Sequence, residues 1–549
     1  MNNYKPMLFT SMKNYSAQQF VKDLVSGIIV AIIALPLSIA LALASGVGPA
    51  QGLYTAIVAG FLISFFGGST VQIAGPTAAF ATIVAGIVAT DGMDGLVVAT
   101  IMAGIMLVLM GVFRLGALIK YIPYTITTGF TAGIAVTILI GQFKDFAGVT
   151  YMNGEKPIET MDKLKAFFAN IDTLNWQAVL VGVVCLAVLI VWPYINKTIP
   201  GSIIAVVVGI LMVKGLGLQV NTIGDLYTVE AGFPKFSMPS FTFGMIKGEA
   251  GNAFTIAILA AIESLLSCVV ADGMVNSKHR SNQELIAQGI GNVGSALFGG
   301  IPATGAIART AANIKSGGRT PVAGMVHAVT LLIVLVVLMP YAAWIPMPTI
   351  AAILFMVAYG MCQWRPFVRL VKLAPKSDIT VLVVTFLLTV IFDLVVAIEI
   401  GMLISCILFI KRMSDETHVT GWTYQNDDEE FVDDLREVRK EIRVFEINGP
   451  LFFGVAEKIA EDITVKDFTK VVVLRMRGVP AIDATALKSL REFYANCEKK
   501  NIKLVLSHVN EQPMKMMDKA GFVDQIGKDN FAPNIDAALD RAEALVAAR

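Results

Sequence analysis

The stretch FFGGSTVQIAGPTAAF, at Phe65–Phe80, interrupts a long apolar region with paired glycines and a Gly-Pro dipeptide. A similar stretch, LFGGIPATGAIARTAAN, follows at Leu297–Asn313 and contains an arginine, Arg309. Both are too short and too rich in glycine and proline to cross a bilayer as one helix. Non-helical backbone survives at membrane depth only where protein buries it or where it lines a watery cavity. The two breaks are therefore the first candidates for a functional site.

The composition around them is that of a membrane protein. Of the 549 residues, 55% are hydrophobic and only 15% are charged, and the mean hydropathy is +0.69. The surface of a water-soluble protein would need more charge than this. The net charge of +1 gives no indication of nucleic acid, and no basic cluster is present to bind it. No cleavage site precedes the first apolar run, so we expect no cleaved signal.

Apolar runs between residues 23 and 412 predict a polytopic α-helical transporter domain with about fourteen spans. The third and tenth spans contain the breaks. Two sets of seven, at about 23–216 and 250–412, predict an inverted repeat with two half-helices, because an odd set reverses the direction of the next one. The predicted ranges are 24–45, 50–66, 72–90, 95–113, 124–143, 175–194, 200–216, 252–272, 284–299, 307–315, 320–340, 348–362, 378–392 and 396–411.

Charge and composition place the remaining segments. Lysine and arginine gather where even-numbered spans end, which places both termini in the cytoplasm by the positive-inside rule. We therefore expect a multi-pass protein of the inner (plasma) membrane of a bacterium, with a cytoplasmic segment at residues 1–22. Residues 413–440 read as an acidic linker. Residues 441–549 alternate strand patterns (IRVFEING, KVVVLRM, IKLVLSHV) with amphipathic helical ones (ATALKSLREFYANCEKK, NIDAALDRAEALVAAR), which predicts a cytoplasmic α/β domain.

The two breaks predict an anion site. Half-helices that meet near the midplane present free backbone N–H groups and the positive ends of their dipoles to one point. Arg309 adds positive charge there, and a charge in the membrane interior is costly and usually functional. The alternative is that Arg309 lies at a helix end and pairs with a carboxylate to stabilise the fold.

A second charge lies in the apolar run FTIAILAAIESLLSCVVADG, at Glu263, with Ser267 one turn further on the same helix face. Burial disfavours a charged carboxylate, so Glu263 can carry a proton, or can hold a sodium ion together with the Ser267 hydroxyl. The alternative is a structural Glu263 that pairs with Arg309 or with a backbone group. His327 reads as a hydrogen-bonded packing residue. No metal-ligand spacing, nucleophile elbow or phosphate loop is present, so an enzyme is not expected.

At this point the chain resembles the SulP-type anion transporters, bacterial relatives of sulfate and chloride exchangers. The resemblance is carried by ALPLSIALALASGVGPAQGLYTAIVAGF, GGSTVQIAGPTAAF, AAIESLLSCVVADG, SNQELIAQGIGN, GAIARTAANIKSGGRTPVAGMVHA and TVIFDLVVAIEIG, and it extends to a carboxy-terminal STAS domain. It implies a seven-plus-seven inverted repeat, an elevator mechanism, a homodimer and substrate between the starts of the third and tenth helices. The substrate positions it implies are Thr77, Ala78, Ala306, Ile307, Ala308 and Arg309, and the ion-coupling positions are Glu263 and Ser267.

The sodium-coupled bicarbonate branch of that family carries Asp, Thr and a hydroxyl side chain where this chain has Glu263, Ser267 and Ile307. It also lacks an arginine at the Arg309 position. The phrases IESLL and GAIARTA are more similar to the branch with proton-coupled C4-dicarboxylate carriers. The prediction is therefore proton symport of a dicarboxylate or sulfate, with no cofactor beyond the coupling ion. Sodium-coupled bicarbonate transport, anion exchange, an uncoupled anion channel and a membrane sensor remain as alternatives.

The STAS domain resembles anti-sigma-factor antagonists, in which a D-S-[ST]-G turn holds a phosphorylatable hydroxyl. Here the phrase is AIDATALKSL, so Thr485 takes the acceptor position and Ala486 replaces glycine. Thr485 is therefore a possible regulatory site, and the alternative is a residue that caps the helix start. The domain can also serve dimerisation or dock a cytosolic protein partner.

Overall fold

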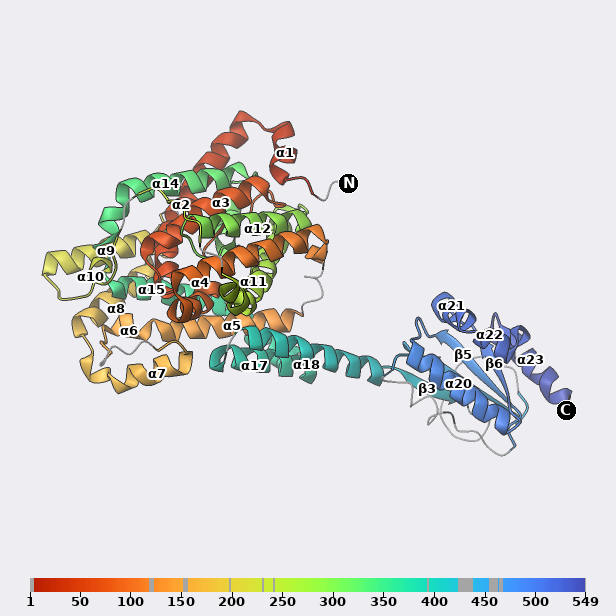
Figure 1. Cartoon of the computed structure of the whole chain (residues 1–549). Coiled ribbons are helices and arrows are strands. Elements are labelled where there is room, and N and C mark those ends of the chain that lie inside the picture. The colour runs from red at the N-terminus through yellow and green to blue at the C-terminus, as the bar shows by residue number, and fades with distance from the viewer. Residues whose placement is uncertain are drawn as a thin grey trace. The chain divides into compact units, whose positions relative to one another are not determined.

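A computed structural model describes residues 4–117, 123–151, 157–196, 199–229, 232–239, 242–392, 394–422, 438–453, 463 and 468–548. The chain divides into two compact units, Met1–Met402 and Leu403–Arg549. Figure 1 labels many of the helices and strands of the two units.

The first unit is helical. Its first half contains α1 (Met7–Ser11), α2 (Ala17–Ala44), α3 (Pro49–Phe66), α4 (Ala78–Val112), α5 (Tyr124–Gly141), α6 (Phe143–Ala147), α7 (Thr160–Ala169), α8 (Trp176–Ile195), α9 (Gly201–Leu216) and α10 (Ile223–Leu226). Its second half contains α11 (Phe243–Val275), α12 (Ser281–Leu297), α13 (Ile307–Lys315), α14 (Val322–Ala342), α15 (Met347–Cys362), α16 (Trp364–Leu373), α17 (Lys376–Ile391) and the start of α18 (Leu394–Asp415).

Eight helices in the described part of the chain are long and apolar enough to cross a bilayer. Each predicted range falls on a helix, and the third and fourth share α4, which bends at Gly92 (φ 70°, ψ −169°). The polytopic helical fold is therefore confirmed, whereas the exact number of spans stays a prediction.

Small residues let some of these helices approach very closely. A Cβ atom added to Gly104 in α4 would lie 2.7 Å from the Gly289 carbonyl oxygen in α12, and a Cβ on Gly289 would collide with the Gly104 carbonyl. Membrane helices associate through such backbone contacts because lipid offers no hydrophobic driving force between them. The packing of α12 along α3 and α4 brings the polar face of α12 to the first break.

Two short strands lie within the helical unit. β1 (Ala74–Gly75) pairs antiparallel with β2 (Thr304–Gly305), with Ala74 opposite Gly305 and Gly75 opposite Thr304. The two breaks predicted from the sequence are therefore joined to each other.

The second unit is an α/β domain with a five-stranded sheet in the order β3-β4-β5-β6-β7. β3 pairs antiparallel with β4, and the other neighbours are parallel. The three predicted strands are confirmed as β4 to β6, and the two predicted helices as α20 and α23. The elements are β3 (His418–Trp422), β4 (Ile442–Asn448), β5 (Val471–Gly478), β6 (Lys503–Ser507), β7 (Phe531–Ala532), α20 (Ala484–Lys499), α21 (Glu511–Lys519), α22 (Phe522–Ile526) and α23 (Ile535–Ala547).

Alternating strand residues build two apolar clusters, one on each face of this sheet. Phe445 and Leu474 pack in the cluster that contains α20 residues, whereas Val444 and Val473 pack in the cluster that contains α23 residues. The period-two pattern of the sequence therefore becomes a sheet covered on both faces.

Candidate functional site

Two helices begin directly after the two paired strands, so the sheet holds the two helix starts close to each other. Helix α4 begins at Ala78, three residues after β1, and α13 begins at Ile307, two residues after β2. The Ala306 N–H also donates to the Ile73 carbonyl oxygen at 2.9 Å, which extends the pairing to the residue before α13. The first N–H groups of a helix have no partner within the helix and carry its positive dipole end. Two such ends fixed to one sheet suit an anion.

Glycine is required at two positions where a side chain of one break lies against the backbone of the other. A Cβ atom on Gly75 would collide with Nη1 of Arg309, and a Cβ on Gly305 would collide with the side-chain amide of Gln72. Each strand therefore leaves space for a polar side chain that comes from the other break.

Arg309 lies in the first turn of α13 and is 3% exposed. Its Nη2 donates to the Pro76 carbonyl oxygen of the first break. Its Nη1 is buried without a hydrogen-bond partner in the described part of the chain. Among the ion pairs of the described residues, none joins Arg309 to Glu263 at contact distance, although the two opposite charges interact electrostatically. A buried guanidinium with an unused donor can receive an oxyanion.

Glu263 lies on α11 beside the start of α4. Its Oε2 accepts a hydrogen bond from the Thr77 hydroxyl at 2.8 Å. Thr77 occupies the N-cap position of α4, but within the described residues its side chain accepts no hydrogen bond from the N–H groups of the helix. The next residue of α11, Ser264, accepts the Gly305 N–H at 3.1 Å. Helix α11 therefore contacts both breaks through adjacent side chains.

Ser267 lies one turn further along α11 and is 1% exposed. Its hydroxyl donates to Oγ1 of Thr310 at 3.5 Å, and the same Oγ1 accepts the Ile73 N–H at 3.0 Å. The structure therefore places Ser267 against α13, where its partner Thr310 also holds the residue before β1. Ser267 takes no part in the hydrogen bond between Glu263 and Thr77.

The remaining predicted substrate positions lie at the helix starts. Thr77, Ala78 and Ala306 are each 7% exposed, whereas Ile307 is 37% exposed, and Ala308 is also exposed. The start of α13 is therefore the open part of the arrangement. All six predicted positions lie within the first turns of α4 and α13 or immediately before them.

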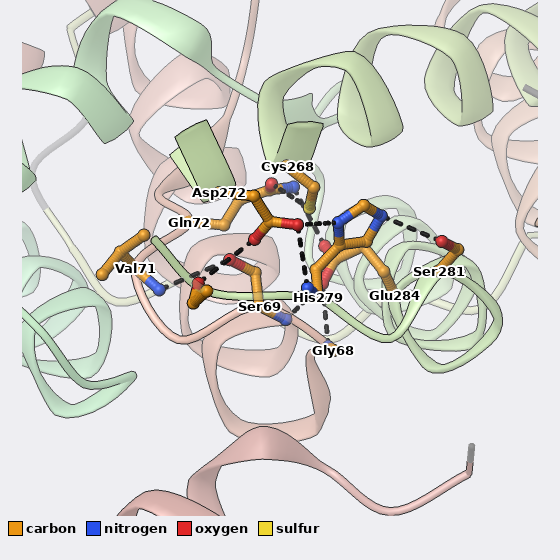
Figure 2. A network of polar contacts seen from close by, with 10 residues as sticks. Gly68, Ser69, Val71, Gln72, Cys268, Asp272, His279, Ser281 and Glu284 are labelled. Atoms are coloured by element: carbon orange, nitrogen blue, oxygen red, sulfur yellow. Dashed lines mark hydrogen bonds and ion pairs between the residues drawn. The ribbon is translucent and has the colours of Figure 1, made fainter. Parts of the chain in front are cut away.

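Sequence reasoning missed a buried polar network beneath the first break (Figure 2). Glu284 and Gln288 of α12 lie in the predicted ninth span, and their i, i+4 spacing in QELIAQ was the available signal.

The prediction that His327 is a hydrogen-bonded packing residue was wrong, because both ring nitrogens are buried without hydrogen-bond partners among the described residues. A polar side chain inside an apolar helix does not reveal from sequence alone which elements it will meet.

In the second unit, Thr485 is exposed in the first turn of α20. The predicted capping role belongs instead to Asp483, whose side chain accepts the Ala486 N–H at 2.8 Å. The capping alternative for Thr485 is therefore wrong, because Asp483 lies at the position whose side chain can reach the third N–H of the helix.

Comparisons with known proteins agree with this architecture. The sulfate permease family matches residues 20–385, and the STAS domain matches residues 435–538. A putative sulfate transporter of Bacillus subtilis, YvdB, is 39% identical over 95% of this chain and 98% of its own length. The bicarbonate transporter BicA of Picosynechococcus is 30% identical over 95% of this chain and 94% of its own length.

Two solved structures share the fold. The murine Solute Carrier 26 family member A9 anion transporter, in an inward-facing state, matches 98% of this chain and 94% of its own with a TM-score of 0.87 and 19% identity. The transmembrane domain of a cyanobacterial BicA matches 71% of this chain and 98% of its own with a TM-score of 0.62 and 29% identity. A transporter fold of many apolar helices with a carboxy-terminal STAS domain is thereby confirmed, whereas the count of fourteen spans in an inverted repeat stays a prediction.

Proposed function

Because the chain belongs to the sulfate permease family, we propose that it is a secondary active transporter that carries a small oxyanion, sulfate or a dicarboxylate, together with a proton. The proteins it is similar to are named as transporters, and the chain is accordingly a multi-pass membrane transporter and not an enzyme. The substrate, the coupling ion and the mechanism belong to the proposal.

One observation supports anion carriage above the others. Two helix starts leave one two-stranded sheet, and Arg309 lies between them with a buried, unpartnered Nη1. A guanidinium offers two parallel N–H donors to an oxyanion, and backbone N–H groups add further donors without a side-chain charge. Thr77, Ala78, Ala306, Ile307, Ala308 and Arg309 are the proposed substrate positions.

Glu263 supports the proton as coupling ion. Its carboxylate reaches the N-cap residue of α4, so a change of protonation there alters the same helix start that would hold the anion. A protonated Glu263 adds no negative charge beside the substrate, whereas an ionised one repels it, and this difference links anion binding to proton binding. An uncoupled channel has no need of a titrating group at this position.

A second candidate is sodium-coupled bicarbonate transport, favoured by the similarity to BicA. Sodium would require oxygen ligands from Glu263 and Ser267. The Ser267 hydroxyl lies 3.5 Å from Thr310 on α13 and has no hydrogen bond to Glu263 among the described residues, so these two groups are not arranged as a pair in this structure.

An elevator-type movement is supported by the packing within the first unit. Helices α3, α4, α11, α12 and α14 pack with one another, and α3 and α11 contact the two-stranded sheet, whereas α5, α8, α9, α15 and α17 pack with one another. The first group would move with the anion and the second would stay fixed, so the site changes its access as a rigid body. The wider proposal includes a homodimer and a bacterial plasma membrane with both termini in the cytoplasm. Its boundaries are 23–412 for the transporter domain, 413–440 for the linker and 441–549 for the STAS domain.

Uptake into proteoliposomes tests the proposal. The purified full chain is reconstituted, and radiolabelled sulfate, fumarate, bicarbonate and chloride are offered under a pH gradient alone or a sodium gradient alone. We expect uptake of sulfate or fumarate above its equilibrium level under an inward proton gradient. Sodium-driven bicarbonate uptake would establish the second candidate, and equilibration without accumulation under either gradient would indicate a channel.

A further inference from the structure

A buried carboxylate that accepts four hydrogen bonds belongs to Glu284, in the first turn of α12. It is 0% exposed. Its Oε2 accepts the backbone N–H groups of Gly68 at 2.8 Å and Ser69 at 3.2 Å. Its Oε1 accepts the side-chain amides of Gln72 at 2.9 Å and Gln288 at 2.8 Å. Figure 2 shows the contacts of Glu284 with the first break.

All four partners donate, and this satisfies both oxygens of a carboxylate. A buried charge is costly unless it is hydrogen-bonded in this way. Three of the four donors come from the segment between α3 and β1, so the carboxylate binds the first break to α12. The Gln283 side chain extends this attachment by donating to the Phe66 carbonyl oxygen at the end of α3, at 2.6 Å.

Gln72 transmits this contact to the second break. Its Nε2 donates to Glu284, and its Oε1 accepts from the Cys268 thiol of α11 at 2.6 Å. The same side-chain amide fills the space that a Cβ on Gly305 would need. Gln72 is therefore held at both ends and lies against the backbone of β2, from which α13 begins.

We propose that Glu284 is a positioning residue for the anion site. It acts through Gln72, which sets the place of β2 and hence the start of α13 relative to the start of α4. This inference rests on the proposed function, because it assigns Glu284 to the site that would hold the anion. Glu284 itself does not touch the substrate.

The rival explanation is that Glu284 only stabilises the fold. A variant of Gln288 distinguishes these two explanations. Gln288 donates to the same Oε1 of Glu284, but it belongs to α12 and has no hydrogen bond to the first break among the described residues. Loss of the Gln288 hydrogen bond lowers stability without releasing Gln72. Loss of the Glu284 acceptor releases Gln72 as well, and a small displacement of a binding group costs much affinity.

The experiment compares four full-length variants with the wild type in sulfate uptake and in hydrogen exchange of residues 68–75. In Glu284→Gln, an NH2 group replaces one of the two carboxylate oxygens, so that it faces N–H donors and can no longer accept hydrogen bonds from them. We expect its KM for sulfate to rise by about tenfold or more with kcat within about twofold, and exchange across residues 68–75 to become faster. Gln72→Met removes the hydrogen bonds of Gln72 to Glu284 and to Cys268, and with them the link to β2, and should show the same rise in KM. Gln288→Met should keep the wild-type KM.

The double variant Glu284→Gln/Gln72→Glu restores one amide facing one carboxylate, and the new carboxylate still accepts from Cys268. We expect it to recover most of the affinity that either single variant loses. If Gln288→Met raises KM as much as Glu284→Gln, or if Gln72→Met leaves KM unchanged, Glu284 is a stability residue and the inference is wrong. If Glu284→Gln does not fold, Gln72→Met and the double variant decide the matter.

Failure of the proposed function gives a different result. A wild type that takes up no anion refutes the transport proposal, and hydrogen exchange then tests the attachment alone. Faster exchange of residues 68–75 in Glu284→Gln, restored in the double variant, supports the positioning contact. Unchanged exchange in all the variants refutes it.

Discussion

The two breaks have the same plan and different chemistry. Each contains a two-residue strand with a glycine, followed within a few residues by a helix start. The first break leads into α4 through Pro76 and Thr77 and has no charged residue in its first turns, whereas the second leads into α13, a helix of nine residues with Arg309 in its first turn. The repeated backbone therefore sets the geometry of the site, and side chains found in only one break set its charge.

Most of the hydrogen bonds between the breaks join a side chain of α13 to a backbone group of the first break. Arg309 donates to the Pro76 carbonyl oxygen, Thr310 accepts from the Ile73 N–H, and Asn313 donates to the Val71 carbonyl oxygen at 2.8 Å. The two breaks therefore share their backbone pairing, whereas the side chains that join them come mainly from the second break. Changes to the second break should therefore disturb both helix starts.

The largest effect is expected from Arg309→Ala, which removes the one charge that distinguishes the breaks. Loss of a charge-assisted pair of hydrogen bonds should weaken sulfate binding by about 10- to 100-fold. The measurement is the rise in unfolding temperature with sulfate concentration in detergent. Lys315→Ala is the matched control, since it removes an exposed positive charge from the last turn of the same helix. Equal sulfate response in wild type and Arg309→Ala would remove Arg309 from the site.

Glu263→Gln should uncouple uptake from the pH gradient while sulfate still binds. The amide oxygen can still accept from Thr77, but the side chain can no longer exchange a proton. We expect sulfate to equilibrate across proteoliposomes without accumulating under an inward proton gradient. Thr77→Val serves as the control for coupling alone, because it removes the hydrogen bond and leaves the carboxyl in place. Its sulfate affinity is not compared, since Thr77 is itself a proposed substrate position. Accumulation that persists in Glu263→Gln would mean that another group carries the proton.

Gly75→Ala tests the crossing of the breaks and should have a moderate effect. The added methyl group collides with the Arg309 guanidinium, so we expect a stability loss of about 1–3 kcal/mol and weaker sulfate binding. Gly86→Ala in α4 is the control, since no described atom beyond its chain neighbours and the backbone of its own helix lies within 4 Å of the added Cβ. Equal thermal stability and sulfate response in the two variants would contradict the crossing.

The smallest effect on the site is expected from truncation after Met413, because both breaks and every residue of the proposed anion site lie in the first unit. We expect the truncated protein to bind sulfate with wild-type affinity and to retain part of its uptake. Complete loss of sulfate binding in a truncated protein that keeps its helical circular dichroism would assign the STAS domain a direct part in the site.

Much of this organisation could be read from local sequence signals. Paired glycines and proline inside apolar runs mark both breaks, and strand-period alternation marks β4 to β6, because each signal depends on neighbouring residues only. The strands β1 and β7 could not be found in this way, because a two-residue strand has no measurable period and its identity as a strand depends on a partner elsewhere in the chain. β3 has five residues, but they lie in the stretch that the sequence predicted as an acidic linker.

By itself, the sequence determined that this chain lies in a membrane, where its helices are interrupted, and that an arginine occurs at one interruption. Only the tertiary structure decided that the interruptions pair as a sheet, that Glu263 meets Thr77, and that Glu284 holds Gln72 against β2. The physical reason is the range of the interactions. Hydrophobicity and backbone restriction act within a few residues along the chain, whereas a buried hydrogen bond joins whichever donors and acceptors the packing of distant helices brings together.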